Sequence, residues 1–207
     1  MNTNWIVVTS INQPTASILK ISELCKRANW SAVVVGDRKS PSNWCCDGVY
    51  FLDINEQESL FPEFGKALPF NHYSRKNLGY LYAIKNGAKV ILETDDDNIP
   101  YEEFGQNISK QVLGNLIKQS NKSDWINVYS HFTESLIWPR GIPLDKISRS
   151  GKPDQTLEEY ECIIQQYLAD NDPDVDAIYR LMFNQDLLFN KENPIILEEN
   201  VWSPFNS

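Results

Sequence analysis

The chain has 207 residues, a length that suits one domain or one domain with an extension. Hydrophobic residues make up 42% of it, enough for a sizeable core, while the formal net charge of −9 disfavours a nucleic-acid partner or an anionic membrane surface. No run approaches the ~18 apolar residues that a membrane span needs, and no signal peptide precedes the first apolar run. We therefore expect a soluble, cytoplasmic protein without membrane insertion.

The first half of the chain alternates the signals of strands and helices. Buried strands are predicted at residues 5–10, 32–37, 49–52 and 90–92, and helices at 16–28, 54–61 and 74–86. Thr15 is placed to cap the first helix and Gly87 to end the last one. A strand, a helix and a second strand in succession form a βαβ unit, which predicts an α/β fold with a mostly parallel central sheet flanked by helices.

The second half gives weaker signals. We predict helix and loop over 101–123, a strand at 125–129, a rigid loop at 138–143 and an apolar segment at 177–183. Residues 156–169 are predicted to form an amphipathic helix, because five apolar side chains fall at helical spacing: Leu157, Tyr160, Ile163, Ile164 and Tyr167.

Three consecutive aspartates, Asp95, Asp96 and Asp97, follow the predicted strand at 90–92. Three carboxylates at the end of a strand repel one another unless a cation lies among them, and Mn²⁺ or Mg²⁺ with oxygen ligands fits this need. A solvated acidic turn is the alternative interpretation.

Other polar residues are predicted to lie at the same edge of the sheet. Thr9 and Ser10 end the first strand, Asp37 ends the second, and Arg75 and Lys76 open a helix. In an open α/β sheet, ligands bind at the carboxyl ends of the strands, and a cationic helix start favours phosphate. Asp37 as a turn residue and Arg75 as a solvated cation are the alternatives.

Several other kinds of site are excluded by their missing motifs. The chain has no P-loop, no Gly-rich dinucleotide fingerprint and no G-x-S-x-G nucleophile turn. Its histidines are His72 and His131, too few for a His-rich metal centre. His131 is a candidate late metal ligand, with a partly buried, hydrogen-bonded histidine as the alternative.

A strand that ends in three aspartates resembles the Asp-x-Asp motif of glycosyltransferases with the GT-A fold. This resemblance implies that Thr9, Asp37 and Arg75 hold the uridine of a UDP-sugar, with Ser10 and Asp96 beside the nucleotide. It also implies that Asp97 binds the metal, while Asp95 lies near the ribose or in the metal shell.

Longer blocks of sequence are similar to the STELLO-type glycosyltransferases. The blocks are residues 5–9, 35–37, 74–84, 86–89, 138–144 and 173–176. Arg140 and the segment after Pro173 also resemble the reversibly glycosylated polypeptides, which are sugar-nucleotide mutases, so Arg140 is implied on the substrate side. Its alternative is a loop cation packed on Trp138.

The size and the start of the chain further resemble the N-terminal glycosyltransferase domain of a multidomain chlorella-virus protein. We therefore expect residues 1–207 to form a single GT-A domain from a longer, virus-encoded chain. Its nucleotide-binding half would cover about 1–100 and its acceptor-side half about 101–207.

Together these features predict a metal-dependent glycosyltransferase that moves a glucose-type or rhamnose-type sugar from a UDP-sugar to a glycan or glycoprotein acceptor. Asp95 and Asp97 would hold Mn²⁺ or Mg²⁺, Lys76 would assist, and Asp174 or Asp176 would orient the acceptor hydroxyl. A non-catalytic module that binds sugar nucleotides or glycans, and a sugar-nucleotide mutase, are the alternatives.

Overall fold

The structure, a computed structural model, describes residues 2–117, 125–148, 156–183, 186–190, 193–198 and 201–203. The chain divides into two compact units, which we call unit 1 (Met1–Ile108) and unit 2 (Ser109–Ser207). Among the described residues, no helix has the length and apolar content needed to cross a membrane.

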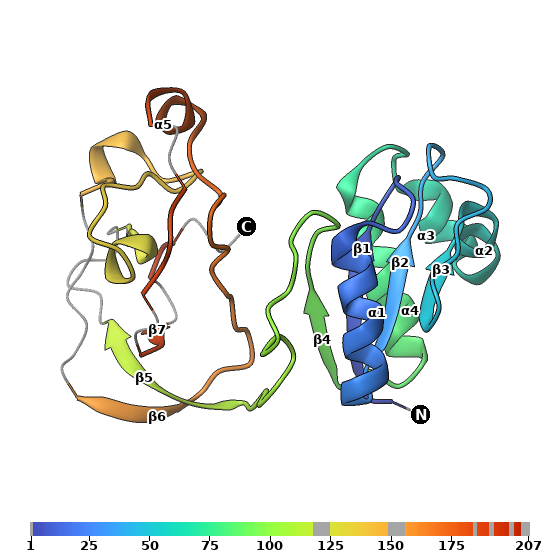
Figure 1. The fold of residues 1–207 in the computed structure, drawn as a ribbon, viewed down its shortest axis with the longest axis horizontal. Helices are drawn as coiled ribbons and strands as arrows, with labels where there is room; N and C mark the ends of the chain where they lie inside the picture. The colour runs from blue at the N-terminus through green and yellow to red at the C-terminus, as the bar shows by residue number, and fades with distance from the viewer. Residues whose placement is uncertain are drawn as a thin grey trace. The chain divides into compact units, whose positions relative to one another are not determined.

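Unit 1 is built on a four-stranded parallel sheet (Figure 1). Its strands are β1 (Asn4–Thr9), β2 (Ser31–Val35), β3 (Val49–Leu52) and β4 (Val90–Glu93), in the order β3-β2-β1-β4. Every neighbouring pair is parallel, so the carboxyl ends of all four strands share one edge. The predicted α/β fold with a mostly parallel central sheet is confirmed.

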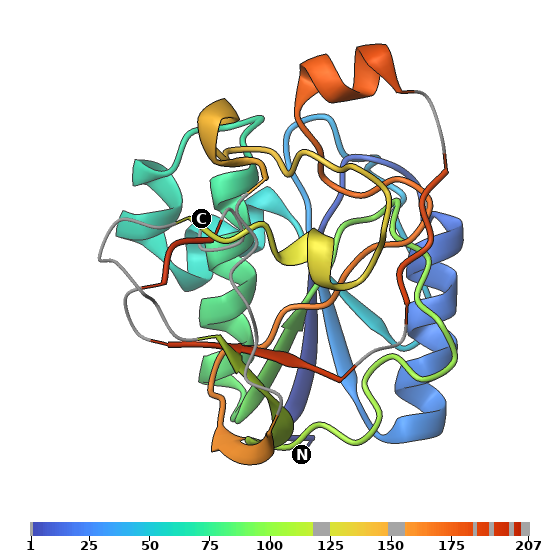
Figure 2. The ribbon, with the colours of Figure 1, turned by 90° about the vertical axis from the view of Figure 1, so that its left-hand side faces the viewer.

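Helices cover both faces of this sheet. Figure 2 shows α1 (Ala16–Ala28) and α4 (Lys76–Lys85) on opposite sides of the strands. The remaining helices of unit 1 are α2 (Ile54–Leu60), α3 (Pro62–Ala67) and the 3₁₀ turn η1 (Tyr73–Arg75). The sequence predicted α1, α2 and α4 but neither α3 nor the separate turn η1.

Alternation along β1 explains this two-faced arrangement. Ile6 packs with Ile18 of α1, while Val7 packs with Leu78 of α4, and all four side chains are fully buried. Successive side chains of a strand point to opposite faces, so a strand that is apolar throughout needs a helix on each side.

The ends of the helices follow from local chemistry. The Thr15 hydroxyl accepts a hydrogen bond from the Ile18 N–H at 3.3 Å, which confirms it as the cap of α1. Gly87 follows α4 with a positive φ of 87°, as predicted for a glycine just beyond a helix. Gly79 lets α4 approach the sheet, because a Cβ there would lie 2.6 Å from Val7 Cγ1 and 2.7 Å from Val35 Cγ2.

The described part of unit 2 holds a smaller, mixed sheet. Strand β5 (Gln111–Ile117) pairs antiparallel with β6 (Leu157–Glu161) and parallel with β7 (Ile195–Leu197). The helical segments described there are η2 (Val128–His131), η3 (Leu144–Lys146) and α5 (Ala177–Met182).

Three predictions for this half were wrong. The stretch predicted as helix at 156–169 begins instead with strand β6, and Ile164 in its apolar stripe is 86% exposed. The predicted strand at 125–129 is a single bridge at Trp125 followed by the 3₁₀ turn η2. The stretch predicted as helix and loop contains strand β5, and its residues 118–123 lie outside the described residues.

Candidate functional site

The middle aspartate of the triplet is fixed by the loop that follows β1. The Ser10 hydroxyl donates to Asp96 Oδ2 at 2.5 Å, and the Asn12 amide donates to the same oxygen at 3.0 Å. The Thr15 hydroxyl donates to the main-chain oxygen of Asp96, also at 2.5 Å. Side chain and backbone of Asp96 are thus both held, so its carboxylate serves as an anchor for the acidic loop.

Asp95 is paired with a lysine from the start of α4. Lys76 Nζ lies 2.9 Å from Asp95 Oδ1, 3.4 Å from the carbonyl oxygen of Thr94 and 3.9 Å from Glu93 Oε1. The lysine side chain is only 12% exposed, whereas that of Asp95 is 63% exposed. An ammonium group therefore neutralises one side of the acidic loop while the Asp95 carboxylate still faces solvent.

Asp97 is exposed and makes no hydrogen bond or ion pair with any residue that the structure describes. Its carboxylate and that of Asp95 are therefore the two accessible anionic groups of the triplet. Hard oxygen donors of this kind suit Mg²⁺ or Mn²⁺, which usually take one or two carboxylates and complete their shell with phosphate oxygens and water.

The residues present fit a metal that is shared with a ligand. The described residues contain no group of three or more His, Cys, Asp or Glu side chains that would hold an ion by themselves. Asp95 and Asp97 would supply two oxygen ligands, and a bound diphosphate would supply others. His131 belongs to η2 in unit 2, so its role as a ligand stays a prediction.

Asp37 holds two loops at the same edge of the sheet. Its Oδ1 accepts the N–H of Arg38 and its Oδ2 accepts the N–H of Asn71, each at 2.7 Å, and the residue is 9% exposed. The Ser40 hydroxyl joins this loop to β1, since it accepts the Asp37 N–H at 2.8 Å and donates to the Ser10 carbonyl at 2.9 Å. In this structure Asp37 positions the edge, and a direct contact with uridine stays a prediction.

Arg75 was predicted to contact the nucleotide, yet its side chain is 1% exposed. Its Nε and Nη2 donate to Gln57 Oε1 at 2.9 and 2.5 Å, and its Nη1 donates to the carbonyls of Gly65 and Leu68. Burial lowers the pKa of this guanidinium from its ordinary value, although nearby Asp37 opposes the shift. This packing favours a structural role for Arg75 over direct contact with a ligand.

Phe70 lies against two cations beside this edge. The guanidinium carbon of Arg38 is 3.7 Å from the centre of the Phe70 ring, and that of Arg75 is 4.4 Å away. Such contacts stabilise a cation on the face of an aromatic ring. Arg38 is exposed, so of the two arginines it is the one that a bound anion can reach.

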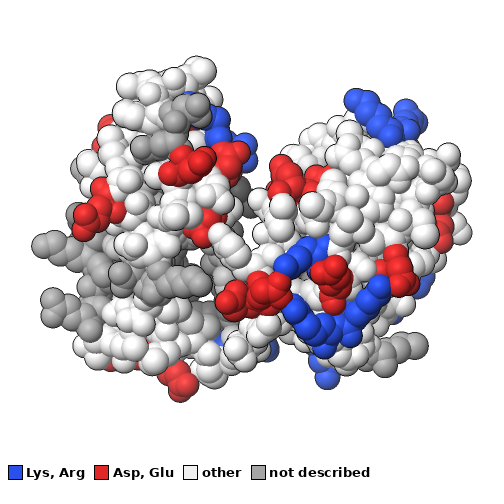
Figure 3. Space-filling view, viewed as in Figure 1, with Lys and Arg blue, Asp and Glu red and all other residues white. Residues whose placement is uncertain are grey.

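Thr9 is the last residue of β1, half-buried and in register with Val35 of β2. The structure therefore brings together Thr9, Ser10, Asp37, Lys76 and the triplet at one edge, as predicted from the parallel sheet. Figure 3 adds that acidic and basic side chains are interleaved on the face of unit 1 turned to the viewer.

On the acceptor side, the structure pairs two of the predicted residues within unit 2. Arg140 Nη2 lies 2.8 Å from Asp174 Oδ2, and the Arg140 N–H donates to the Asp174 carbonyl at 3.2 Å. Both side chains are exposed, at 72% and 56%. Asp176 instead caps α5, because its Oδ1 accepts the N–H of Ile178 at 2.8 Å.

Sequence reasoning missed four residues at these sites. Asn12 supports the triplet, Gln57 satisfies the buried Arg75, Phe70 contacts both arginines, and Asn71 binds Asp37 through its backbone. Asn12 offered a signal, because a short polar side chain just after a strand lies at the ligand edge. The roles of Gln57, Phe70 and Asn71 depend on contacts between segments that lie far apart in the sequence.

Two known proteins are similar to this chain. No protein-family model matches the chain. It is 28% identical over 221 residues to each of two Arabidopsis thaliana proteins, "Probable glycosyltransferase STELLO2" and "Probable glycosyltransferase STELLO1". The matches cover 98% of this chain but only 28% of the length of either relative. The STELLO-like resemblance is thus supported, and the chlorella-virus origin stays a prediction.

Proposed function

We propose that this chain is a STELLO-like, GT-A glycosyltransferase domain that takes a sugar from a UDP-sugar with the help of Mn²⁺ or Mg²⁺. The observation that carries the proposal is the acidic loop after β4, where Asp96 is anchored while Asp95 and Asp97 remain accessible. Similarity to two probable glycosyltransferases over nearly the whole chain supports the reaction class.

Asp95 and Asp97 are the residues that would hold the ion. The bound cation would supply Lewis-acid stabilisation of the negative charge that develops on the departing diphosphate. Anchoring of Asp96 by Ser10 and Asn12 keeps its two neighbours in a fixed backbone geometry, so little reorganisation is needed when the donor binds.

Lys76 has a second part in this proposal. Its ammonium group lies against Asp95 and is largely shielded from solvent, so it already offsets the charge of the acidic loop. Lys76 would also add positive charge beside the donor phosphates, where an ammonium group stabilises the leaving group.

The acceptor would lie against Arg140 and Asp174. Their ion pair is exposed and is tied to a backbone hydrogen bond, so the Asp174 carboxylate has a defined position. A carboxylate within hydrogen-bond reach of an acceptor hydroxyl orients it and takes its proton in an inverting transfer. Asp176 is engaged at the start of α5 and would act only through that helix.

The proposal is tested with the Asp97→Ala variant. Wild-type protein incubated with a panel of UDP-sugars and Mn²⁺ should release free UDP, and the variant should release at least 100-fold less, since one of two metal ligands is lost. Isothermal titration calorimetry with UDP should show a matching loss of Mn²⁺-dependent affinity.

Glu103→Ala provides a matched control, because it removes an exposed carboxylate from the same unit outside the triplet. It should keep both UDP release and metal-dependent binding. Metal-dependent UDP binding that survives in Asp97→Ala would refute the metal assignment. Tight binding of UDP-sugars by the wild type with no release of UDP would instead identify a non-catalytic sugar-nucleotide module.

A further inference from the structure

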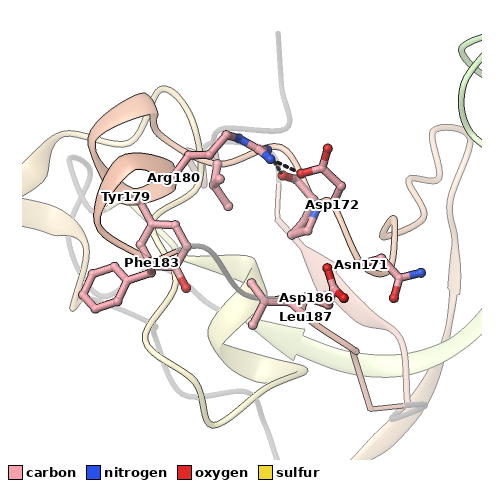
Figure 4. A pocket seen from close by; sticks show the side chains of 9 residues that line it. Asn171, Asp172, Tyr179, Arg180, Phe183, Asp186 and Leu187 are labelled. Carbon is pink, nitrogen blue, oxygen red and sulfur yellow. Dashed lines mark hydrogen bonds and ion pairs between the residues drawn. The ribbon is translucent and has the colours of Figure 1, made fainter.

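Unit 2 contains a pocket of about 320 Å³ that none of the predicted roles explains (Figure 4). Its walls come from the segment 171–175, from α5 and from residues 186–187. The residues that shape its chemistry are Asn171, Asp172, Tyr179, Arg180, Phe183 and Asp186.

Aromatic residues line one side of the pocket. Tyr179 is 2% exposed, and its hydroxyl donates to the Leu136 carbonyl at 2.7 Å. The Phe183 ring packs on Tyr179 with ring centres 5.0 Å apart, and Trp138 packs behind both at 5.9 and 6.4 Å. These ring contacts pack the aromatic side chains against one another at this side of the pocket.

The other side carries the charged groups of Asp172, Arg180 and Asp186. Arg180 forms an ion pair with Asp172, drawn as a dashed line in Figure 4, and donates from Nη2 to the Pro173 carbonyl at 2.9 Å. Asp186 also lines the pocket, and its carboxylate makes no hydrogen bond or ion pair with any residue in the described part of the chain. The pocket thus offers a positioned donor group and an unengaged acceptor group.

Charge and size limit what can bind. Two aspartates and one arginine give these walls a net charge of −1 (−2 + 1), which disfavours a phosphate-bearing ligand. The volume lies at the small end of the range of about 300–1,000 Å³ for ligand pockets, so it suits one or two sugar rings better than a whole sugar nucleotide. A neutral polyhydroxy ring matches the pocket, since its hydroxyls both donate to carboxylates and accept from a guanidinium.

We propose that this pocket binds a neutral sugar ring of the acceptor glycan, with the hydroxyls of the ring on Asp186 and Arg180. That the bound sugar belongs to an acceptor rests on the glycosyl transfer proposed above; the binding of a sugar ring does not. The polar groups of the pocket make it selective, because a ring without hydroxyls would cover them without forming hydrogen bonds to them.

The test is a protein-observed NMR titration of the whole chain with methyl α-D-glucopyranoside, methyl α-L-rhamnopyranoside and methyl β-D-xylopyranoside, without donor or metal. At least one glycoside should shift the backbone amides of residues 171, 172, 174, 175 and 179–183 with millimolar affinity. Cyclohexanol and inorganic phosphate should leave those amides unshifted. Equal shifts with cyclohexanol would overturn the proposal, because the pocket would then recognise only apolar area.

A substitution of Asp186 tests whether its carboxylate takes part in binding the glycoside. Asp186→Asn keeps the shape of the side chain and removes its charge, and it should weaken binding of the glycoside about tenfold, as expected for the loss of a charge-assisted hydrogen bond. Asp145→Asn is the matched control, because Asp145 is an exposed aspartate of unit 2 outside the pocket, and it should bind like the wild type. The amide spectrum of each variant reports directly whether its fold is kept.

The two proposals fail separately. If the wild type releases UDP from a UDP-sugar and no glycoside shifts the pocket amides, the pocket proposal is overturned and the transferase proposal stands. If a glycoside binds and Asp186→Asn weakens it while no UDP-sugar is turned over, the binding of a sugar ring stands, and the transferase proposal falls together with the acceptor role of that sugar.

Discussion

The two units bury their apolar side chains in different ways. Unit 1 has clusters of ten and seven buried residues, one on each face of its sheet. The described part of unit 2 has clusters of five and three. Its Leu181 and Ile164 are 87% and 86% exposed. Unit 1 is therefore stabilised mainly by hydrophobic burial across a sheet, while unit 2 has less of this stabilisation to draw on.

In unit 2, backbone bridges between loops supply part of the stabilisation that hydrophobic burial supplies in unit 1. Pro139 pairs with Val175, Asn171 with Leu187 and Trp125 with Trp202, each as a single bridge rather than a ladder. Such isolated bridges expose more of their hydrogen bonds to water than a central strand does, so they open at lower free energy. The proposed nucleotide edge therefore lies on the unit with the larger buried clusters, and the proposed acceptor residues lie on the unit with the smaller ones.

The largest effect is expected from making the same kind of cavity in the core of each unit, which tests whether unit 1 depends more on hydrophobic burial than unit 2. Leu78→Ala removes a fully buried side chain from unit 1 and should cost about 2–5 kcal/mol. Ile137→Ala in unit 2 should cost no more than the low end of that range, about 2 kcal/mol, because fewer buried neighbours surround it. Urea unfolding followed by hydrogen exchange with mass spectrometry would measure each loss within its own unit.

Tyr129→Phe serves as a control in unit 2, because it keeps the buried ring and removes only the hydroxyl. Its effect on exchange should be smaller than that of Ile137→Ala. Equal losses for the two alanine variants would show that both units depend on burial to the same extent.

A smaller effect is expected where α4 touches the sheet. Gly79→Ala would place a methyl group 2.6 Å from Val7 Cγ1, too close for a normal contact, so the helix must shift away from β1. Overpacking of this kind costs about 1–3 kcal/mol even though alanine is the better helix former. Thermal unfolding should show a lower midpoint than for Gly87→Ala, where a Cβ meets no atom within 4 Å and only the positive φ opposes the change.

The smallest effect is expected on the surface of unit 1. Glu102 forms ion pairs with Lys20 and Arg27, whose hydrogen bonds lower its pKa from 4.5 to about 2. Because the folded-state pKa is depressed, the stabilisation is full above pH 4.5 and is lost as the pH falls toward 2. Glu102→Gln should therefore lower the urea midpoint slightly at pH 7 and not at pH 2.

Salt is the control for this last prediction, since Glu102 and Arg27 are exposed and Lys20 is half-buried. The difference between variant and wild type should shrink in 1 M NaCl, where the Debye length is about 3 Å. A difference that persists unchanged at pH 2 and in high salt would mean that Glu102 acts through packing rather than charge.

The difference between the units also explains which elements could be predicted. The strands of unit 1 are continuous apolar runs followed by polar residues, and such local patterns are visible in sequence. The apolar stripe at 157–167 fits a helix equally well, yet pairing with β5 made its first residues a strand. That choice depends on a segment that lies at least forty residues away in the sequence (157 − 117 = 40 at the nearest strand ends), which no local pattern reports.

The sequence predicted which residues lie at the edge of the sheet, but it did not predict which groups their side chains contact. A parallel sheet brings Ser10, Asp37 and the triplet to one edge, and this followed from strand order along the chain. Whether Asp37 faces a ligand or binds backbone N–H groups depends on the loop at Asn71, and whether Arg75 is free depends on Gln57. Both partners come from segments whose approach is set by packing.

Anchoring of Asp96 by Ser10 and Asn12 has a consequence for how such motifs vary. In a strict Asp-x-Asp pattern the central position is free, but here it accepts two side-chain donors from the loop after β1. Only a residue that accepts hydrogen bonds, such as Asn, can replace Asp96 and keep those donors satisfied. Related sequences should therefore change position 96 together with positions 10 and 12, a covariation that an alignment would reveal before any enzyme is assayed.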